Sequence, residues 1–222
     1  MSLLVTALAR GKKAMRRILV AMALTAIGLT PVSATAQTAP TCFGKTATIV
    51  GTEGDDTISG TTGTDVIVAL DGTDKVFGWH DPEPSYPYEP TLPDEMDYIC
   101  GGANASEGGG GDPDESLRGG YGRDRIAGGG GADLLLGGVG NDVLMGGSSQ
   151  DWLYGEGGHD RLYADGGDEV YANNLLGGPG DDYLEGRLGT RDRFYGGSGY
   201  DTCVMGPEDI ILDDKCEEII PA

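Results

Sequence analysis

The sequence is poor in basic residues, in large aromatic side chains and in histidine. Its 222 residues include 15 Lys and Arg against 36 Asp and Glu, with only 3 Phe, 2 Trp and 2 His. The net charge of −21 excludes a nucleic-acid-binding protein, because such a protein needs a basic face. High charge with few large apolar side chains also makes intrinsic disorder a first alternative.

Motifs for common catalytic and metal sites are missing as well. The sequence contains neither an H-E-x-x-H helix nor a G-x-S-x-G turn, and its Cys and His residues do not cluster at zinc-site spacing. A twelve-residue EF-hand loop is also missing. We therefore expect a protein that is not an enzyme.

The first 36 residues have the pattern of a secretory signal peptide. No acidic residue precedes Glu53, five basic residues lie between Arg10 and Arg17, an apolar run follows over 18–29, and small residues close the segment at 34–36. Twelve apolar residues are short for a membrane span, although a membrane anchor is the alternative. The pattern predicts a secreted, extracellular protein, and translation can begin at Met1 or Met15.

Cleavage after Ala36 would leave an unusually acidic chain without a membrane-spanning segment. Five of the 15 basic residues and none of the 36 acidic residues precede the cleavage point, so the remaining net charge is −26. Such self-repulsion opposes a compact state unless cations neutralise it.

Glycine, by contrast, is abundant, and it marks an internal repeat. The 41 glycines recur in nine-residue units with the consensus G-G-x-G-x-D-x-U-x, where U is a large apolar residue. Seven units fill 101–163 without a change of phase, and about fifteen occupy 51–204. A proline-rich segment at 79–97 interrupts the series and predicts an insertion loop.

These units resemble the nonapeptides of the RTX, or hemolysin-type calcium-binding repeat, family. The layout is similar to that of stand-alone secreted calcium-binding proteins of bacteria. The resemblance implies an all-β protein with a parallel β-roll, a β-solenoid that binds calcium in its turns.

A physical interpretation of the unit agrees with this resemblance. Each unit ends in a three-residue strand with one inward apolar side chain, and stacking of the units would join these side chains into a core. Two units would form one coil, with a strand in each of two sheets. The predicted inward residues are Ile58, Ile67, Val76, Ile99, Leu117, Ile126, Leu135, Leu144, Leu153, Leu162, Leu175, Leu184 and Phe194.

The aspartate of each unit is the candidate metal ligand. Stacked carboxylates repel one another unless an ion lies between them, and Ca²⁺ accepts six to eight carboxylate and carbonyl oxygens. The alternative is that each aspartate only stabilises its own turn. We expect several Ca²⁺ ions at Asp56, Asp65, Asp74, Asp97, Asp124, Asp133, Asp142, Asp151, Asp160, Asp182, Asp192 and Asp201.

Some units depart from the consensus, and this predicts weak or missing sites beside them. Ser106, Glu115 and the region of Asn173 replace the aspartate, and Pro113 and Ser149 replace the fourth-position glycine. Without calcium the carboxylates would repel, so we expect a largely unfolded calcium-free state.

Terminal segments at 37–50 and 205–222 would cap the roll. Four cysteines in an exported chain suggest two disulfides, for which three pairings are possible. We favour Cys42–Cys100 and Cys203–Cys216, because each would tie a terminal segment to the roll, with free thiols as the alternative. The apolar tail at 210–212 and 219–220 would cover the open end.

The functional expectation is a structural or interaction role that depends on calcium ions. Surface adhesion, or binding or modification of a polysaccharide by a β-solenoid face, is the alternative. A cell-surface or polysaccharide partner could contact Trp79, Tyr86 or Tyr88 of the insertion. An ice-binding face is disfavoured because no outward array of threonines recurs in register.

Overall fold

We describe the protein from a computed structural model, which defines residues 39–78, 96–102, 115–164, 171–186, 190–212 and 215–222. The signal peptide predicted over 1–36 and most of the insertion predicted over 79–97 lie outside these residues. Residues 38–222 belong to one compact unit. In the described part of the chain no helix is long and apolar enough to cross a membrane.

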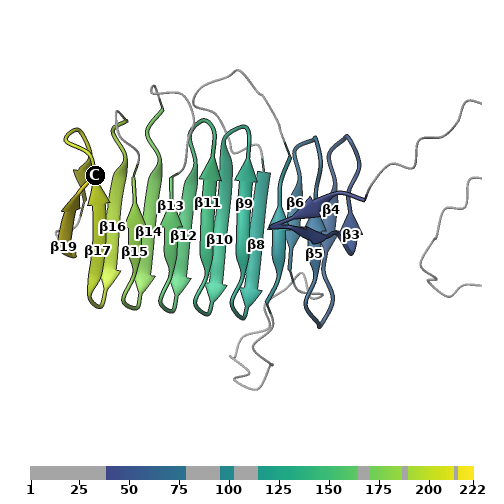
Figure 1. Ribbon diagram of the computed structural model, residues 1–222, viewed down its shortest axis with the longest axis horizontal. Helices are drawn as coiled ribbons and strands as arrows, with labels where there is room; N and C mark the ends of the chain where they lie inside the picture. The colour runs from purple at the N-terminus through teal and green to yellow at the C-terminus, as the bar shows by residue number, and fades with distance from the viewer. Residues whose placement is uncertain (1–38, 79–95, 103–114, 165–170, 187–189, 213–214) are drawn as a thin grey trace, which may run out of the picture. The chain divides into compact units, whose positions relative to one another are not determined.

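The described residues form two parallel β-sheets that face each other (Figure 1). The eight-stranded sheet contains β4 (Thr57–Ser59), β6 (Lys75–Phe77), β8 (Glu115–Tyr121), β10 (Asp133–Val139), β12 (Trp152–Gly157), β14 (Asn174–Pro179), β16 (Arg193–Ser198) and β18 (Ile210–Ile211). The nine-stranded sheet contains β3 (Ile49–Val50), β5 (Val66–Val68), β7 (Tyr98–Cys100), β9 (Arg125–Gly129), β11 (Val143–Gly147), β13 (Arg161–Tyr163), β15 (Tyr183–Glu185), β17 (Asp201–Met205) and β19 (Cys216–Pro221).

Successive strands alternate between the two sheets, so two repeat units make one coil. In β10 and β12, for example, Leu135 pairs with Leu153, which is two nonapeptides further along the chain. The same register joins Leu144 of β11 to Leu162 of β13. The predicted all-β parallel β-roll is therefore confirmed.

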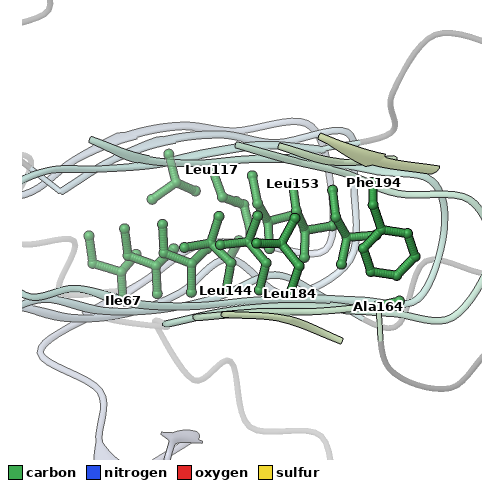
Figure 2. Close-up of a cluster of buried hydrophobic side chains, with 14 of the residues drawn as sticks. Ile67, Leu117, Leu144, Leu153, Ala164, Leu184 and Phe194 are labelled. Carbon is green, nitrogen blue, oxygen red and sulfur yellow. The ribbon is translucent and has the colours of Figure 1, made fainter. Parts of the chain in front are cut away.

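One inward side chain from each strand builds a continuous core between the sheets (Figure 2). All thirteen predicted inward residues are buried, and from Val76 to Phe194 they have no exposed surface. Burial of a leucine side chain contributes about 1.5–3 kcal/mol. No single coil could fold on this contribution, and the stack of coils is what stabilises the roll.

The N-terminal segment covers the outer face of the nine-stranded sheet. The short antiparallel hairpin of β1 (Thr41–Cys42) and β2 (Lys45–Thr46) belongs to a second apolar cluster. That cluster includes Val66, Val68 and Tyr98, whose side chains point away from the main core. The Cys42–Cys100 disulfide joins β1 to β7, as predicted.

The C-terminal tail forms the second predicted disulfide, Cys203–Cys216, inside the main core. The tail is the last coil of the stack: β18 pairs with β16 and β19 pairs with β17, so the tail continues both sheets beyond the repeat series. Leu212 and Ile219 remain more than half exposed as a result.

Candidate functional site

The turns between the two sheets place the repeat aspartates in two rows, one at each edge of the roll. Each aspartate immediately precedes or begins a strand, and in most of them the side chain reaches back to a main-chain N–H of the preceding coil. We call a unit clean when it matches the consensus without insertions. In every clean unit a glycine stands at the first position of the turn, and in most units a second glycine adopts a positive φ, such as 113° at Gly178. A residue with a Cβ rarely adopts such an angle.

The first row follows the nine-stranded sheet. Each main-chain N–H in this row donates a hydrogen bond to a carboxylate oxygen of the next coil, at 2.7–2.9 Å. Such charge-assisted bonds are stronger than bonds between neutral groups. The row runs through Asp65, Asp97, Asp124, Asp142, Asp160, Asp182, Asp201 and Glu217.

The second row follows the eight-stranded sheet with the same hydrogen-bond pattern. One hydrogen bond of this row joins Asp56 to Asp74. A second run of hydrogen bonds leads from Asp133 through Asp151, Asn173 and Asp192 to Asp209. Glu115 occupies the position between Asp74 and Asp133, because it pairs with Asp133 in the sheet. All twelve predicted aspartates thus lie in one of the two rows.

Besides Glu115, three members of the rows were not among the predicted site residues. The Asn173 side chain accepts the N–H of Asp151 at 2.8 Å, so the asparagine continues the row without a charge. Asp209 and Glu217 belong to the tail, outside the repeat series. A sequence signal existed for Asp209 and Glu217, because each follows the preceding member of its row, Asp192 or Asp201, by nearly the length of one coil.

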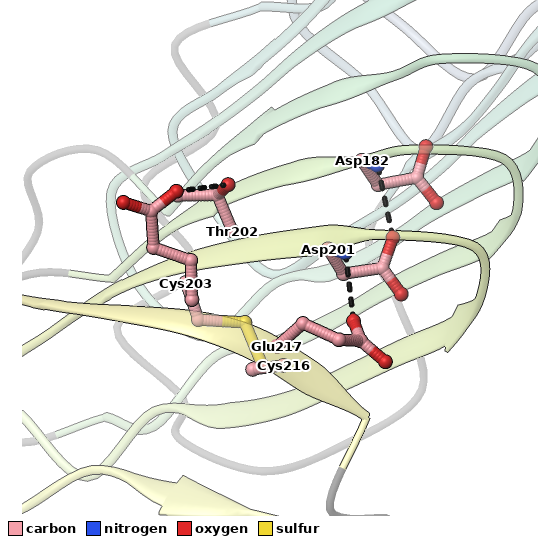
Figure 3. The surroundings of a disulfide bond; sticks show 7 residues. Asp182, Asp201, Thr202, Cys203, Cys216 and Glu217 are labelled. Atoms are coloured by element: carbon pink, nitrogen blue, oxygen red, sulfur yellow. Dashed lines mark hydrogen bonds between the residues drawn. A yellow bond between two sulfur atoms is a disulfide. The ribbon is translucent and has the colours of Figure 1, made fainter.

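The end of the first row lies beside the C-terminal disulfide (Figure 3). There, the N–H of Asp182 donates to Asp201, and the N–H of Asp201 donates to Glu217 (Figure 3). Because Cys216 precedes Glu217 directly, its bond to Cys203 holds the glutamate in line with the row. The disulfide therefore positions the last acidic side chain.

In several members of the two rows one carboxylate oxygen accepts the hydrogen bond between coils and the other has no donor. The Oδ2 atoms of Asp74, Asp151, Asp160 and Asp182 are buried and have no hydrogen-bond partner. A buried anionic oxygen without a donor is strongly unfavourable, so this arrangement calls for a positive charge.

The first glycine of each clean unit lies directly against this second oxygen. A Cβ atom added at Gly155 would collide with Asp160 Oδ2 and with the carbonyl oxygen of Gly177 in the next coil. An equivalent pair of oxygens borders Gly177, namely Asp182 Oδ2 and the carbonyl oxygen of Gly196. Side-chain and main-chain oxygens of two coils thus gather around each first glycine.

Burial raises the pKa of several of these carboxyl groups. The pKa rises to about 7 for Asp151 and Asp160 and to about 6 for Asp182, chiefly because burial disfavours the charged form. Repulsion from neighbouring carboxylates raises the pKa further, as from Asp201 on Asp182. Main-chain hydrogen bonds oppose the rise.

The donor set fits a hard cation with many oxygen ligands. Among the described residues, no three His, Cys, Asp or Glu side chains converge as a metal cluster. A cation in these turns would therefore combine carboxylate oxygens of the row with main-chain carbonyls. Ca²⁺ accepts such a mixed oxygen set, whereas zinc prefers nitrogen and sulfur ligands and Mg²⁺ demands stricter octahedral geometry.

The fold and the acidic turns define a parallel β-roll made of glycine- and aspartate-rich nonapeptides. The chain belongs to the RTX calcium-binding nonapeptide repeat family, which matches it in four copies over residues 48–79, 107–144, 136–168 and 170–203. No curated protein sequence and no solved structure matches the chain significantly. The family match makes calcium the cation to consider and describes a calcium-binding structural protein.

Proposed function

We propose that this protein is a secreted structural protein whose roll binds several Ca²⁺ ions along both edges and needs them to fold. The observation that carries the proposal is the set of buried carboxylate oxygens without hydrogen-bond donors, at Asp74, Asp151, Asp160 and Asp182. Membership of a calcium-binding repeat family supports the choice of ion.

The ligands would come from the turns of neighbouring coils. The Oδ2 atoms of the rows would bind the ions, while the Oδ1 atoms keep their hydrogen bonds to the preceding coil. Main-chain carbonyls beside the first glycines, such as that of Gly177, would complete the oxygen shell. The main candidate ligands are Asp74, Asp97, Asp124, Asp133, Asp142, Asp151, Asp160, Asp182 and Asp201.

Calcium would stabilise the folded roll because the ligands are assembled only when the coils stack. In the unfolded chain the carboxylates are dispersed in water, so the free energy of calcium binding adds to that of folding. Without calcium, the raised pKa values of Asp151 and Asp160 show how poorly the folded turns accommodate charge.

The proposed location is extracellular. The basic, apolar and small-residue pattern over 1–36 supports export, and the two disulfides suit an oxidising compartment. The millimolar calcium outside cells would keep even weak sites occupied.

The test is a calcium titration of residues 37–222 with the disulfides intact. Circular dichroism should show little β-structure in metal-free buffer and a cooperative gain with Ca²⁺, and calorimetry should show several bound ions. Mg²⁺ at the same concentration should not replace Ca²⁺. A β-sheet spectrum that is the same with and without calcium would contradict the folding role, and no heat of binding would contradict the calcium sites.

A further inference from the structure

The first two turns of the roll differ from the later turns at their second position. Thr52 and Thr61 stand where the clean units have glycine. The N–H of Thr52 donates to Asp56 Oδ2 at 2.6 Å, and its hydroxyl donates to the same oxygen at 2.9 Å. Thr61 donates to Asp65 Oδ2 in the same way, at 2.6 and 3.0 Å.

The cause is the backbone conformation that a threonine can adopt. In most later turns the second residue has a positive φ, such as 111° at Gly147 and 113° at Gly178. A β-branched residue strongly disfavours that region, and neither threonine is found there. Each threonine turn takes another conformation, in which both donors of the threonine face the carboxylate.

The consequence is that the leftover carboxylate oxygen is already neutralised by hydrogen bonds in these two turns. At Asp151, Asp160 and Asp182 the equivalent oxygen is buried without a donor. A cation at Asp56 Oδ2 or Asp65 Oδ2 would meet hydrogens that point at the same oxygen. It could bind only if the turn opened and changed conformation.

The same end of the roll has two further sources of stability that do not involve the acidic turns. The Cys42–Cys100 disulfide closes a loop with a sequence separation of 58 residues. The hairpin also packs a second apolar cluster, in which Cys42, Val66, Val68 and Tyr98 are at least nine-tenths buried. Lys45 lies 4.6 Å from the centre of the Tyr98 ring, which adds a cation–π contact.

We propose that the threonine turns at Thr52–Asp56 and Thr61–Asp65 replace calcium sites, so that the N-terminal end of the roll folds without calcium. This end comprises the described residues 39–68, and the turns of Asp74 and Asp97 that follow it still carry candidate calcium ligands. It presents β5 as a formed edge on which β7 and the following calcium-dependent coils can assemble. The inference rests on the proposed role of calcium in the later turns.

Hydrogen exchange measured by mass spectrometry on residues 37–222 in metal-free buffer tests the inference. The main-chain amides of the paired strands β3 and β5 should stay protected, while those of β9 to β17 should exchange rapidly. Calcium should then protect the later strands. Rapid exchange of both groups without calcium would overturn the inference and leave the proposed function intact. Protection of every strand without calcium would overturn the proposed folding role and, with it, the contrast inferred here.

A variant tests the contribution of the threonine turns separately from that of the disulfide and the hairpin. Thr52→Gly combined with Thr61→Gly restores the consensus in both turns. In this variant β3 and β5 should lose protection without calcium and regain it with calcium, and native mass spectrometry should count up to two additional ions. The matched control, Thr62→Gly with Thr64→Gly, removes two exposed threonines from one of the same turns and should change neither result. An unchanged ion count and exchange pattern in the restored variant would overturn the inference.

Discussion

The main-chain N–H of Asp160 donates a hydrogen bond to Oδ1 of Asp182 in the next coil, at 2.8 Å, while Asp182 Oδ2 is buried without a donor. One carboxylate therefore has two roles in the same turn. Its first oxygen fixes the register of neighbouring coils, and its second presents a negative charge that the protein itself does not neutralise. Substitutions that remove only one of these roles can distinguish them.

Replacing Asp160 by asparagine should separate register from charge. Asn173 already continues the second row as an asparagine, so Asp160→Asn should keep the hydrogen bond to Asp142. It removes a charged ligand, and since a charged contact is worth about 1.5–3 kcal/mol, calcium affinity at this position should fall at least about tenfold. Calorimetric titration measures this change.

The control for this variant is Asp181→Asn. Asp181 is an exposed carboxylate next to Asp182, and its Oδ1 accepts the N–H of Tyr200, a bond that asparagine can preserve. Its calcium affinity should stay within about twofold of that of the original protein. Equal losses in the two variants would show that net charge, and not the buried row, determines calcium binding.

The first glycine of a clean turn should not tolerate a side chain. In Gly155→Ala the new Cβ would collide with Asp160 Oδ2 and the Gly177 carbonyl, so the turn must open. The free energy of unfolding in calcium should fall by about 1–3 kcal/mol, measured by urea denaturation. Gly54→Ala is the matched control, because a Cβ there meets no atom within 4 Å and φ is not positive. A similar loss at Gly54 would argue against the steric explanation.

The metal-free roll should become more stable on acidification. The folded pKa of Asp151 and Asp160 is about 7 and that of Asp182 about 6, against 3.8 in the unfolded chain. The folded state therefore binds protons more tightly, and its stability falls as pH rises from about 4 to about 7. Circular dichroism of metal-free protein should show more β-structure at pH 5 than at pH 8.

Calcium should reverse this pH dependence, because the bound ion requires ionised carboxylates. Calcium affinity should fall below pH 7, and binding near pH 6.5 should release protons into a weakly buffered solution. The variant Asp160→Asn should release fewer protons. Release that is unchanged in this variant would mean that other groups titrate.

Loss of the C-terminal disulfide should loosen the last coils selectively. Cys203 and Cys216 are separated by 13 residues, and closing a loop of this size is worth about 3 kcal/mol. In Cys203→Ala with Cys216→Ala, amides of β17 and β19 should exchange faster in calcium, while those of β5 and β7 should not change. Uniformly faster exchange would show instead that the roll unfolds as one cooperative unit.

The regular part of the roll was predictable because, in a repeat, residues that touch in neighbouring coils are a fixed and short distance apart in the sequence. A fixed nine-residue period places Leu135 beside Leu153 and Asp124 beside Asp142, once two units form a coil. The observed cysteine pairing was the one favoured among three, because it ties each terminal segment to the roll. Asp209 and Glu217 were missed since their segments do not resemble the consensus, and only strand pairing with β16 and β17 brings them into the rows.

The sequence by itself determined the coil, the inward row of apolar side chains and the two rows of aspartates, because these depend only on period and on side-chain alternation. The tertiary structure alone decided how the ends differ from the middle. It placed the hairpin on the outer face of the nine-stranded sheet and left Ile219 exposed. It also showed that Thr52 closes the turn of Asp56, because that depends on which backbone conformation the turn adopts in the folded stack.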